Sequence, residues 1–381
     1  MTSIVLPGGE RYELRGGAVS SAGAAPARTR IAYAAAHVVA DPLAENVPGA
    51  PATLDWDGTL AFRHHLWRHG LGVAEAMDTA QRGMGLDYPA VRELVRRSAS
   101  EARSVGGRIV AGVATDQLDG PATVPRVLEA YREQLADVVE AGAVPVIMCS
   151  RHLAAAAKGP DDYLSVYSTL LSEVDSPVLL HWLGSMFDPA LAGYWGTLDV
   201  AAAADTVLAL LKDHSAKVDG IKMSLLDMDF EVDVRRKLPA GVRMYTGDDF
   251  NYPSLIAGDE QGYSDALLGV FAAIAPAVGP ALAELDKGDE KAFHALLDPT
   301  VPLARHLFGA PTQYYKTGIV FLAWLSGHQQ HFTMVGGLQS GRSVTHLAKL
   351  LVLADEAGLL PHADLAASRA RAFLSVAGVP Q

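Results

Sequence analysis

The chain has 381 residues, and its 31 Lys and Arg against 43 Asp and Glu give a formal net charge of −12. Half of the residues are apolar and only 19% are charged, which is typical of a folded protein with a large core and excludes a disordered chain. No segment is dense in Lys or Arg. Neither nucleic acid nor an anionic membrane surface is therefore expected as a partner, because both require clustered cations.

The N-terminus predicts a β-hairpin followed by a linker, together covering residues 1–28. Two short β-type segments, residues 4–6 and 12–14, lie on either side of a Pro-Gly-Gly turn. A tract of small residues, 16–26, follows them. The first seven residues lack a basic segment followed by an apolar core, so we expect no secretion signal and a cytoplasmic location.

From residue 29 onward, apolar β-type segments alternate with segments of helical period. The predicted strands are residues 31–39, 72–77, 108–114, 144–149, 177–182, 218–222 and 242–246, with an eighth near 262–267. The predicted helices between them include residues 90–104, 124–141, 163–173 and 201–213. Alternation of this kind is typical of a parallel sheet covered by helices. Eight such units predict an α/β fold of the (β/α)8 TIM barrel type over residues 29–288.

The remainder of the chain, residues 289–381, predicts a C-terminal helical extension. It has helical period and is broken by Gly-containing turns. Two uncharged segments, 266–283 and 317–341, approach the length of a membrane span, but prolines interrupt the first and a polar His-Gln-Gln-His segment the second. We expect buried helices that also cover a surface in a homo-oligomer, because the first segment needs cover.

A single cysteine, Cys149, excludes an internal disulfide and a multi-cysteine metal site. The most informative reactive residue is Lys222, which ends the apolar strand predicted at 218–222. In a barrel, chemistry takes place where the strands end, so we expect this amine to be buried and to face the barrel axis. Burial lowers the pKa of an amine and makes it a nucleophile for carbonyl carbon. The alternative is a structural lysine paired with a carboxylate such as Asp248.

The motif Gly220-Ile221-Lys222, followed by Gly247-Asp248-Asp249 at the end of the next strand, resembles the dihydrodipicolinate synthase and N-acetylneuraminate lyase superfamily. More specifically, the chain resembles a divergent branch of it, labelled only "dihydrodipicolinate synthase family protein". The superfamily consists of Schiff-base aldolases and lyases on a (β/α)8 barrel with a C-terminal helical extension. The resemblance therefore implies this fold and an imine-forming role for Lys222.

The resemblance aligns residues 78–82 with the Gly-Thr-Thr-Gly-Glu loop that holds the carboxylate of a keto acid in the superfamily. Only Thr79 is kept, and it is expected to bind substrate oxygen. Arg82 either supplies an anion site through its fork of donors or is a surface arginine at a helix start.

The superfamily's catalytic tyrosine after the fifth strand aligns with His181, so we expect this imidazole to move protons beside Lys222, directly or through one water. The alternative is a histidine packed beside Trp182. A tyrosine could instead place its hydroxyl beside the amine and move the protons, and the candidates are Tyr33, Tyr245 and Tyr263.

A second family tyrosine falls on residues 148–152, where Ser150 and His152 are the polar candidates for substrate binding. Because the proton relay and the carboxylate loop both differ from those of the family, the specificity for pyruvate is not carried over. His37, which ends the first strand, and Asp248 complete the predicted substrate-binding set.

Histidines at strand ends also allow a different interpretation. His37, His152, His181 and Asp248 could together form a divalent-metal site, although no zinc motif accompanies them. His65 and His69, four residues apart, are expected on the solvated face of a surface helix.

We predict a Schiff-base-forming lyase or aldolase that acts on a small carbonyl compound, plausibly a sugar-derived keto acid or aldehyde, without a cofactor. Two alternatives remain open. One is a metal-dependent barrel isomerase or aldolase, and the other is a non-catalytic sugar-binding or regulatory barrel.

Overall fold

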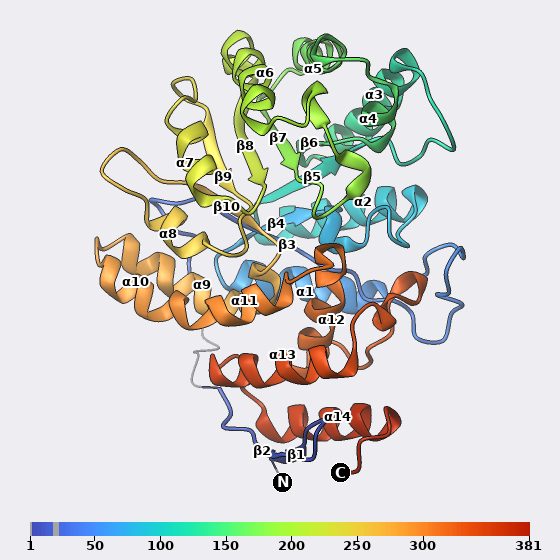
Figure 1. Cartoon of the computed structure of the whole chain (residues 1–381), viewed down its shortest axis with the longest axis vertical. Coiled ribbons are helices and arrows are strands. Elements are labelled where there is room, and N and C mark those ends of the chain that lie inside the picture. Colours follow the sequence, from blue (N-terminus) through green and yellow to red (C-terminus); the bar gives the residue numbers. More distant parts are fainter. Residues whose placement is uncertain (1, 18–22) are drawn as a thin grey trace.

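A computed structural model describes residues 2–17 and 23–381. Its centre is a closed barrel of eight parallel strands in the order β10-β3-β4-β5-β6-β7-β8-β9, surrounded by helices (Figure 1). The strands are β3 (Ala32–Ala35), β4 (Gly72–Glu75), β5 (Ile109–Val113), β6 (Val144–Met148), β7 (Val178–Leu183), β8 (Val218–Ser224), β9 (Arg243–Thr246) and β10 (Asp265–Leu268). The predicted (β/α)8 barrel is confirmed, and its eighth strand is β10.

The barrel interior is filled by side chains that point inward at every second position of the strands. Leu179 on β7 belongs to this interior cluster, and Gly220 is its register partner on β8. Two residues further along, His181 and Lys222 are register partners and point inward as well. The strand pattern thus places these two side chains next to each other near the carboxyl ends of the strands.

The helices that cover the barrel begin and end at residues with the expected capping chemistry. Asp55, Asp87 and Asp199 accept hydrogen bonds from the first turns of their helices, and Gly106 and Gly142 end helices in the left-handed conformation. The helices are α1 (Trp56–Arg68), α2 (Tyr88–Val105), α3 (Val124–Ala141), α4 (Arg151–Ala156), α5 (Pro160–Glu173), α6 (Val200–Asp213), α7 (Met228–Arg235), α8 (Tyr252–Ala257) and α9 (Phe271–Leu285).

A helical extension follows the barrel and covers the edge at which the strands end (Figure 1). Its helices are α10 (Glu290–Leu297), α11 (Val301–Leu307), α12 (Tyr315–Leu325), α13 (Val344–Glu356) and α14 (Ala363–Val376). Helix α12 is buried along nearly its whole length, because α9, α11, α13 and α14 pack around it. The extension therefore contributes side chains to the barrel mouth.

The uncharged segment 266–283 forms β10 and most of α9, and it is covered within the single chain. Helix α9 packs against α10, α12 and β3, and apolar residues such as Phe271 and Ile274 are fully buried. The segment therefore no longer argues for an oligomer, and the homo-oligomer stays a prediction. In the described part of the chain no single helix meets the length and apolarity needed to cross a membrane, while the bent pair Pro189–Gly196 and Val200–Asp213 meets them together.

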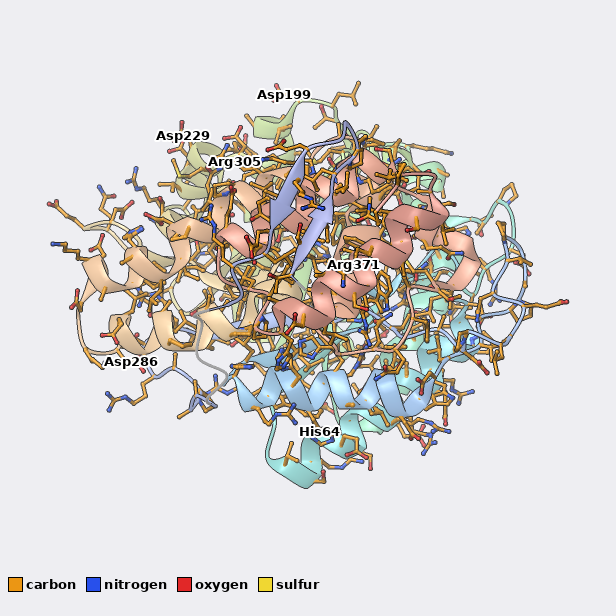
Figure 2. The ribbon with its side chains drawn as sticks, turned by 90° about the horizontal axis from the view of Figure 1, so that it is seen from below. His64, Asp199, Asp229, Asp286, Arg305 and Arg371 are labelled. Atoms are coloured by element: carbon orange, nitrogen blue, oxygen red, sulfur yellow. The ribbon has the colours of Figure 1, made fainter. Side chains whose placement is uncertain are left out.

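The N-terminal hairpin consists of β1 (Ser3–Val5) and β2 (Arg11–Glu13) and lies against α14, close to Arg371 (Figure 2). The Arg371 side chain donates to the Ser3 carbonyl at 2.8 Å, and the Tyr12 hydroxyl donates to Asp355 at 2.7 Å. The predicted hairpin is therefore confirmed. Of the predicted linker tract 16–26, residues 18–22 lie outside the described residues.

Candidate active site at the barrel mouth

Lys222 lies near the carboxyl end of β8 and points into the barrel. Its side chain is buried, with a residue exposure of 7%. Burial lowers the pKa of the amine, and the carboxylates of Asp249 and Asp78 partly oppose this effect. No hydrogen bond or ion pair joins the amine to any residue in the described ranges. The placement expected from the sequence is therefore observed, and the amine is available to a ligand.

A small cavity adjoins the Lys222 side chain, and we call it the inner chamber. Its volume of about 10 Å³ is about that needed for one water. The strand ends supply most of its walls, and α12 supplies a tyrosine. The chamber is lined by Met77, Asp78, Thr79, Leu183, Phe187, Lys222, Ser224, Asp249, Gly269 and Tyr315.

Two glycines leave the space that the reactive side chains occupy. A Cβ atom at Gly247 would lie 2.2 Å from the Ser224 Oγ and 2.8 Å from the Lys222 Cε. A Cβ atom at Gly269 would lie 3.1 Å from the Tyr315 ring. Because both distances at position 247 are shorter than real Cβ contacts, a larger residue there would force Ser224 and Lys222 away from their observed positions.

Asp249 is the carboxylate that lines the inner chamber beside Lys222. It is 3% exposed and accepts a hydrogen bond from the Val270 amide at 2.8 Å. Burial raises the pKa of this carboxyl, and the nearby amine opposes the rise. The pKa of the Lys222 amine is lowered and that of the Asp249 carboxyl is raised, so the two pKa values approach each other. Similar pKa values favour transfer of a proton between the two groups near neutral pH.

Tyr315 places a phenol in the inner chamber, and the sequence did not single it out. Its hydroxyl lies 2.6 Å from the Thr79 Oγ1, and its ring stacks on Phe308 at a centroid distance of 4.2 Å. Burial raises the pKa of the phenol, so the hydroxyl keeps its proton at neutral pH. Thr79 therefore has a tyrosine partner, supplied by the C-terminal extension.

The three tyrosines named as alternatives lie elsewhere. The Tyr245 hydroxyl donates to Asp219 at 2.6 Å, and the Tyr33 ring is its neighbour at 6.2 Å between centroids. Tyr263 is 41% exposed and packs under the guanidinium of Arg30.

His181 lies beside Lys222 in the barrel interior but does not itself line the inner chamber. Its Nε2 lies 3.1 Å from the Ser224 Oγ, and Ser224 does line the chamber. Burial and the adjacent Lys222 charge hold the pKa of His181 well below its usual value, so the ring is neutral. The imidazole therefore reaches the chamber through the serine hydroxyl.

A larger space, which we call the outer cavity, lies next to the inner chamber and shares the walls Asp78, Leu183 and Phe187 with it. Its volume is about 360 Å³. Thr115 lines it and lies 2.5 Å from the Ser150 Oγ and 3.0 Å from the His152 Nδ1. Two of the predicted substrate-binding residues are thus brought together around a hydroxyl that the sequence did not single out.

Lys316 is a second buried amine and lines the outer cavity. It is 2% exposed, and its Nζ lies 3.5 Å from the Asp78 carboxylate. Neither oxygen of Asp78 accepts a hydrogen bond from a residue that the structure describes. A sequence signal for Lys316 did exist: it is the last charged residue before the uncharged segment 317–341.

Arg82 also lines the outer cavity, but the protein itself uses its donors. The guanidinium binds both oxygens of Asp116 at 2.6 and 3.0 Å, the Gly112 carbonyl at 2.7 Å, the Ala76 carbonyl at 3.3 Å and the Gln134 side chain. These bonds occupy all five N–H groups. The expectation of a free anion site at Arg82 is corrected: the residue holds its loop to β5.

Two predicted substrate-binding residues line neither space. His37 is 1% exposed, and its Nε2 lies 3.0 Å from the Gln329 side-chain oxygen. Asp248 accepts from the amides of Phe250 and Asn251 and stabilises the start of α8. The neighbouring Asp249, in the turn that follows β9, lines the inner chamber with the lysine instead.

The histidines and Asp248 named for a metal site are not assembled into one. His37, His152 and His181 have separate partners, as given above. Within residues 2–17 and 23–381 no group of three or more His, Cys, Asp or Glu side chains is arranged to hold a metal ion.

Comparisons with known proteins agree with this architecture. The model of the family described as "Protein of unknown function (DUF993)" matches residues 7–379. No curated protein sequence matches the chain. Among solved structures, dihydrodipicolinate synthase from Aquifex aeolicus superposes with a TM-score of 0.66 at 13% identity, covering 87% of this chain and 98% of that one.

Two further solved structures are similar. YagE, a prophage protein of the dihydrodipicolinic acid synthase family from E. coli K12 solved in complex with pyruvate, has a TM-score of 0.68 at 14% identity, covering 87% of this chain and 99% of that one. A putative dihydrodipicolinate synthetase from Pseudomonas aeruginosa has a TM-score of 0.66 at 14% identity, covering 87% and 100%. The chain therefore has the fold of these proteins.

Proposed function

The chain belongs to the DUF993 family, and we propose that it is a Schiff-base-forming lyase or aldolase that acts on a small carbonyl compound. One observation carries the proposal: the buried amine of Lys222 shares an inner chamber with Asp249 and with the hydroxyl pair of Thr79 and Tyr315. Likeness in fold to YagE, which was solved with pyruvate, supports carbonyl chemistry at this end of the barrel.

In the proposed reaction, the neutral Lys222 Nζ attacks the carbonyl carbon and forms a carbinolamine. Loss of the oxygen as water leaves an iminium ion, which accepts the electron pair of the bond that breaks. A substrate hydroxyl then loses its proton as the adjacent carbon–carbon bond breaks, which yields an enamine and a second carbonyl product. Protonation of the enamine carbon and hydrolysis of the iminium ion release the first product and restore the amine.

Two of the proton transfers in this sequence have candidate carriers in the inner chamber. The protonated Tyr315 phenol is suited to donate to the departing oxygen, with Thr79 orienting it. Asp249 is suited to take the proton that Lys222 loses. His181, behind Ser224, is suited to act as a positioning residue through the serine hydroxyl rather than as the direct acid predicted from the sequence.

The outer cavity supports a substrate class of polyhydroxylated acids or aldehydes, such as a sugar-derived keto acid. Thr115, Ser150 and His152 offer hydroxyl and imidazole groups, and Lys316 offers a cation for an acidic group. Because the inner chamber holds only about one water, the carbonyl end must displace Leu183 or Phe187 from the shared wall to reach Lys222.

Reductive trapping tests the proposal. The protein is incubated with pyruvate, with hydroxylated 2-keto acids or with sugar aldehydes, and borohydride is then added. We expect one carbonyl compound to leave its reduced mass on the peptide that contains Lys222, with loss of activity, because borohydride converts an imine to a stable secondary amine.

The matched variants are Lys222→Arg and Lys237→Arg. The first should abolish trapping and activity, because a guanidinium stays protonated, and the second should change neither, because Lys237 is exposed. A chelator should have no effect. Activity that survives Lys222→Arg but is lost on chelation would establish the metal-dependent alternative, and binding without turnover or trapping would establish the sugar-binding one.

A further inference from the structure

A third cavity lies away from the barrel mouth, where α1 meets α9, α12 and the segment between α13 and α14. We call it the junction cavity, and its volume is about 210 Å³. One arginine and four histidines provide most of its polar lining: His65, Arg68, His69, His328 and His362. The sequence predicted a solvated helix face for His65 and His69, but the C-terminal helices cover this side of α1, and the two residues are 8% and 4% exposed.

The imidazoles and the guanidinium of the junction cavity have no side-chain hydrogen-bond partner among the residues that the structure describes. None of the four imidazoles forms a side-chain hydrogen bond or ion pair with a residue within 2–17 and 23–381, and the Arg68 guanidinium forms none either. The rings of His65, His69 and His328 lie against one another and against Phe62, with 4.1 Å between the centroids of His65 and His328 and 4.7 Å between those of His65 and His69. Arg68 and His362 are exposed and His328 is half-buried, whereas the Nδ1 of His69 is buried without a hydrogen-bond partner among the described residues. Such an atom is rare in native proteins, because its desolvation is not compensated.

The charge of the junction cavity is unbalanced. No Asp or Glu lines it, although acidic residues outnumber basic ones in the whole chain. Burial and neighbouring cationic groups lower the pKa of His65 to about 2 and of His328 to about 4, so these rings are neutral. A neutral imidazole still donates one N–H, and Arg68 carries a permanent positive charge.

The remaining walls are apolar and come from Ala272 and Pro276 on α9, Leu322 on α12 and Leu359 after α13. A cavity with one cation, several N–H donors and an apolar floor matches a ligand with one anionic head and a short apolar body. Metal binding is a weaker match, because the described histidines form no metal-holding group.

We propose that the junction cavity binds a small organic anion, a carboxylate or a phosphate ester. The anionic oxygens pair with the Arg68 guanidinium and accept N–H bonds from His65 and His69, and the body of the ligand contacts Leu322 and Pro276. The site is separate from the one proposed for Lys222, so either proposal can fail without the other.

Isothermal titration calorimetry of the wild-type chain with inorganic phosphate and with butyrate measures the affinity of this site. We expect at least one probe to bind, and Arg68→Gln and His69→Gln to weaken it by about tenfold or more, since each removes a hydrogen bond to a charged group. Tighter binding of phosphate would indicate a phosphate ester, and tighter binding of butyrate a carboxylate.

Two control variants locate the anion. His64→Gln changes a histidine of the same helix, on the side of α1 turned away from the C-terminal helices (Figure 2), where His64 pairs with Glu101. Lys316→Met removes the cation of the outer cavity. Both variants should bind the probe as tightly as the wild type.

Nuclear magnetic resonance of 15N-labelled histidine rings provides a second readout, in which binding itself is observed on the wild-type chain. The probe should shift the signals of His65 and His69, the latter assigned by its loss in His69→Gln, and leave that of His64 unchanged. Absence of binding at millimolar probe, or binding that Lys316→Met abolishes while Arg68→Gln leaves it unchanged, would overturn the proposal.

Discussion

Cations line both the barrel mouth, where they are buried, and the junction cavity, where Arg68 is exposed, but the two regions differ in what faces those cations. At the mouth, Lys222 lies near Asp249 and Asp78, and Lys316 lies 3.5 Å from Asp78. In the junction cavity, Arg68 and its neighbouring imidazoles face no carboxylate. Paired charges allow protons to move between groups, whereas an unpaired cation attracts an anion. The barrel mouth is therefore suited to catalysis, and the junction cavity is suited to binding an anion.

Helix α12 connects the two regions. Tyr315 and Lys316 at its start reach the barrel mouth, and Leu322 further along lines the junction cavity. The two regions therefore lie along one buried helix. Variants near its start should affect catalysis, and variants at the junction cavity should affect anion binding.

After Lys222→Arg, removal of the Tyr315 hydroxyl has the largest expected effect at the mouth. Tyr315→Phe keeps the ring that stacks on Phe308 but removes the proposed proton donor. We expect kcat to fall about 10²- to 10⁴-fold, as for the loss of a general acid, with little change in KM. Tyr314→Phe, at the preceding residue, is the matched control and should leave kcat unchanged. Equal kcat values in the two variants would remove Tyr315 from the mechanism.

Variants of Lys316 and Arg82 should affect different properties: the first should weaken substrate binding, and the second should lower the stability of the fold. Lys316→Met should raise KM for an acidic substrate about 10- to 100-fold, because a charged hydrogen bond is lost. Arg82→Met should instead lower the free energy of unfolding by about 3 kcal/mol, because it removes the ion pair with Asp116 and the donor to the Ala76 and Gly112 carbonyls. Steady-state kinetics and denaturant unfolding measure the two effects. A large KM change in Arg82→Met with unchanged stability would reverse the assignment.

Asp249 should control the pH dependence of the reaction. The attacking amine must be neutral, so kcat/KM rises as pH passes the pKa of Lys222, which burial lowers below its usual value. The Asp249 carboxylate stabilises the ammonium form and raises that pKa. Asp249→Asn should therefore move the acidic limb of the kcat/KM profile to lower pH, by about one unit. A shift toward higher pH would show that the two groups are not coupled in this way.

His37 should have the smallest effect on activity, because it lines neither the inner chamber nor the outer cavity. His37→Gln should leave kcat and KM within about twofold and lower the free energy of unfolding by about 1 kcal/mol, because the bond to Gln329 is altered. A kinetic effect as large as that of Tyr315→Phe would return His37 to the site.

The His37→Gln variant should also change how the stability of the protein depends on pH. Burial lowers the pKa of His37 to about 3, so as pH falls below about 6.5 the unfolded chain takes up a proton that the folded chain refuses. The wild type should lose stability as pH falls through this window, and His37→Gln should lose less. Thermal unfolding at several pH values measures the difference.

The barrel and the place of Lys222 were predictable from the sequence because both depend on local patterns. Apolar segments alternating with helical ones specify strands and crossovers, and the period of two along a strand sets which side chains point inward. A lysine at the end of such a segment therefore had to lie at the barrel mouth. For the same reason Thr79, Ser150 and His152, which follow strand ends, came close to the predicted location.

The partners of these residues were not predictable, because they come from segments distant in sequence. Tyr315 and Lys316 reach the mouth only because α12 packs under the strand ends, 236 positions after Thr79 in the case of the tyrosine. The same packing buries His65 and His69, whose helical spacing alone indicates only a shared face. Local propensity determines where strands and helices form, whereas the burial of distant apolar faces determines which of their polar groups meet.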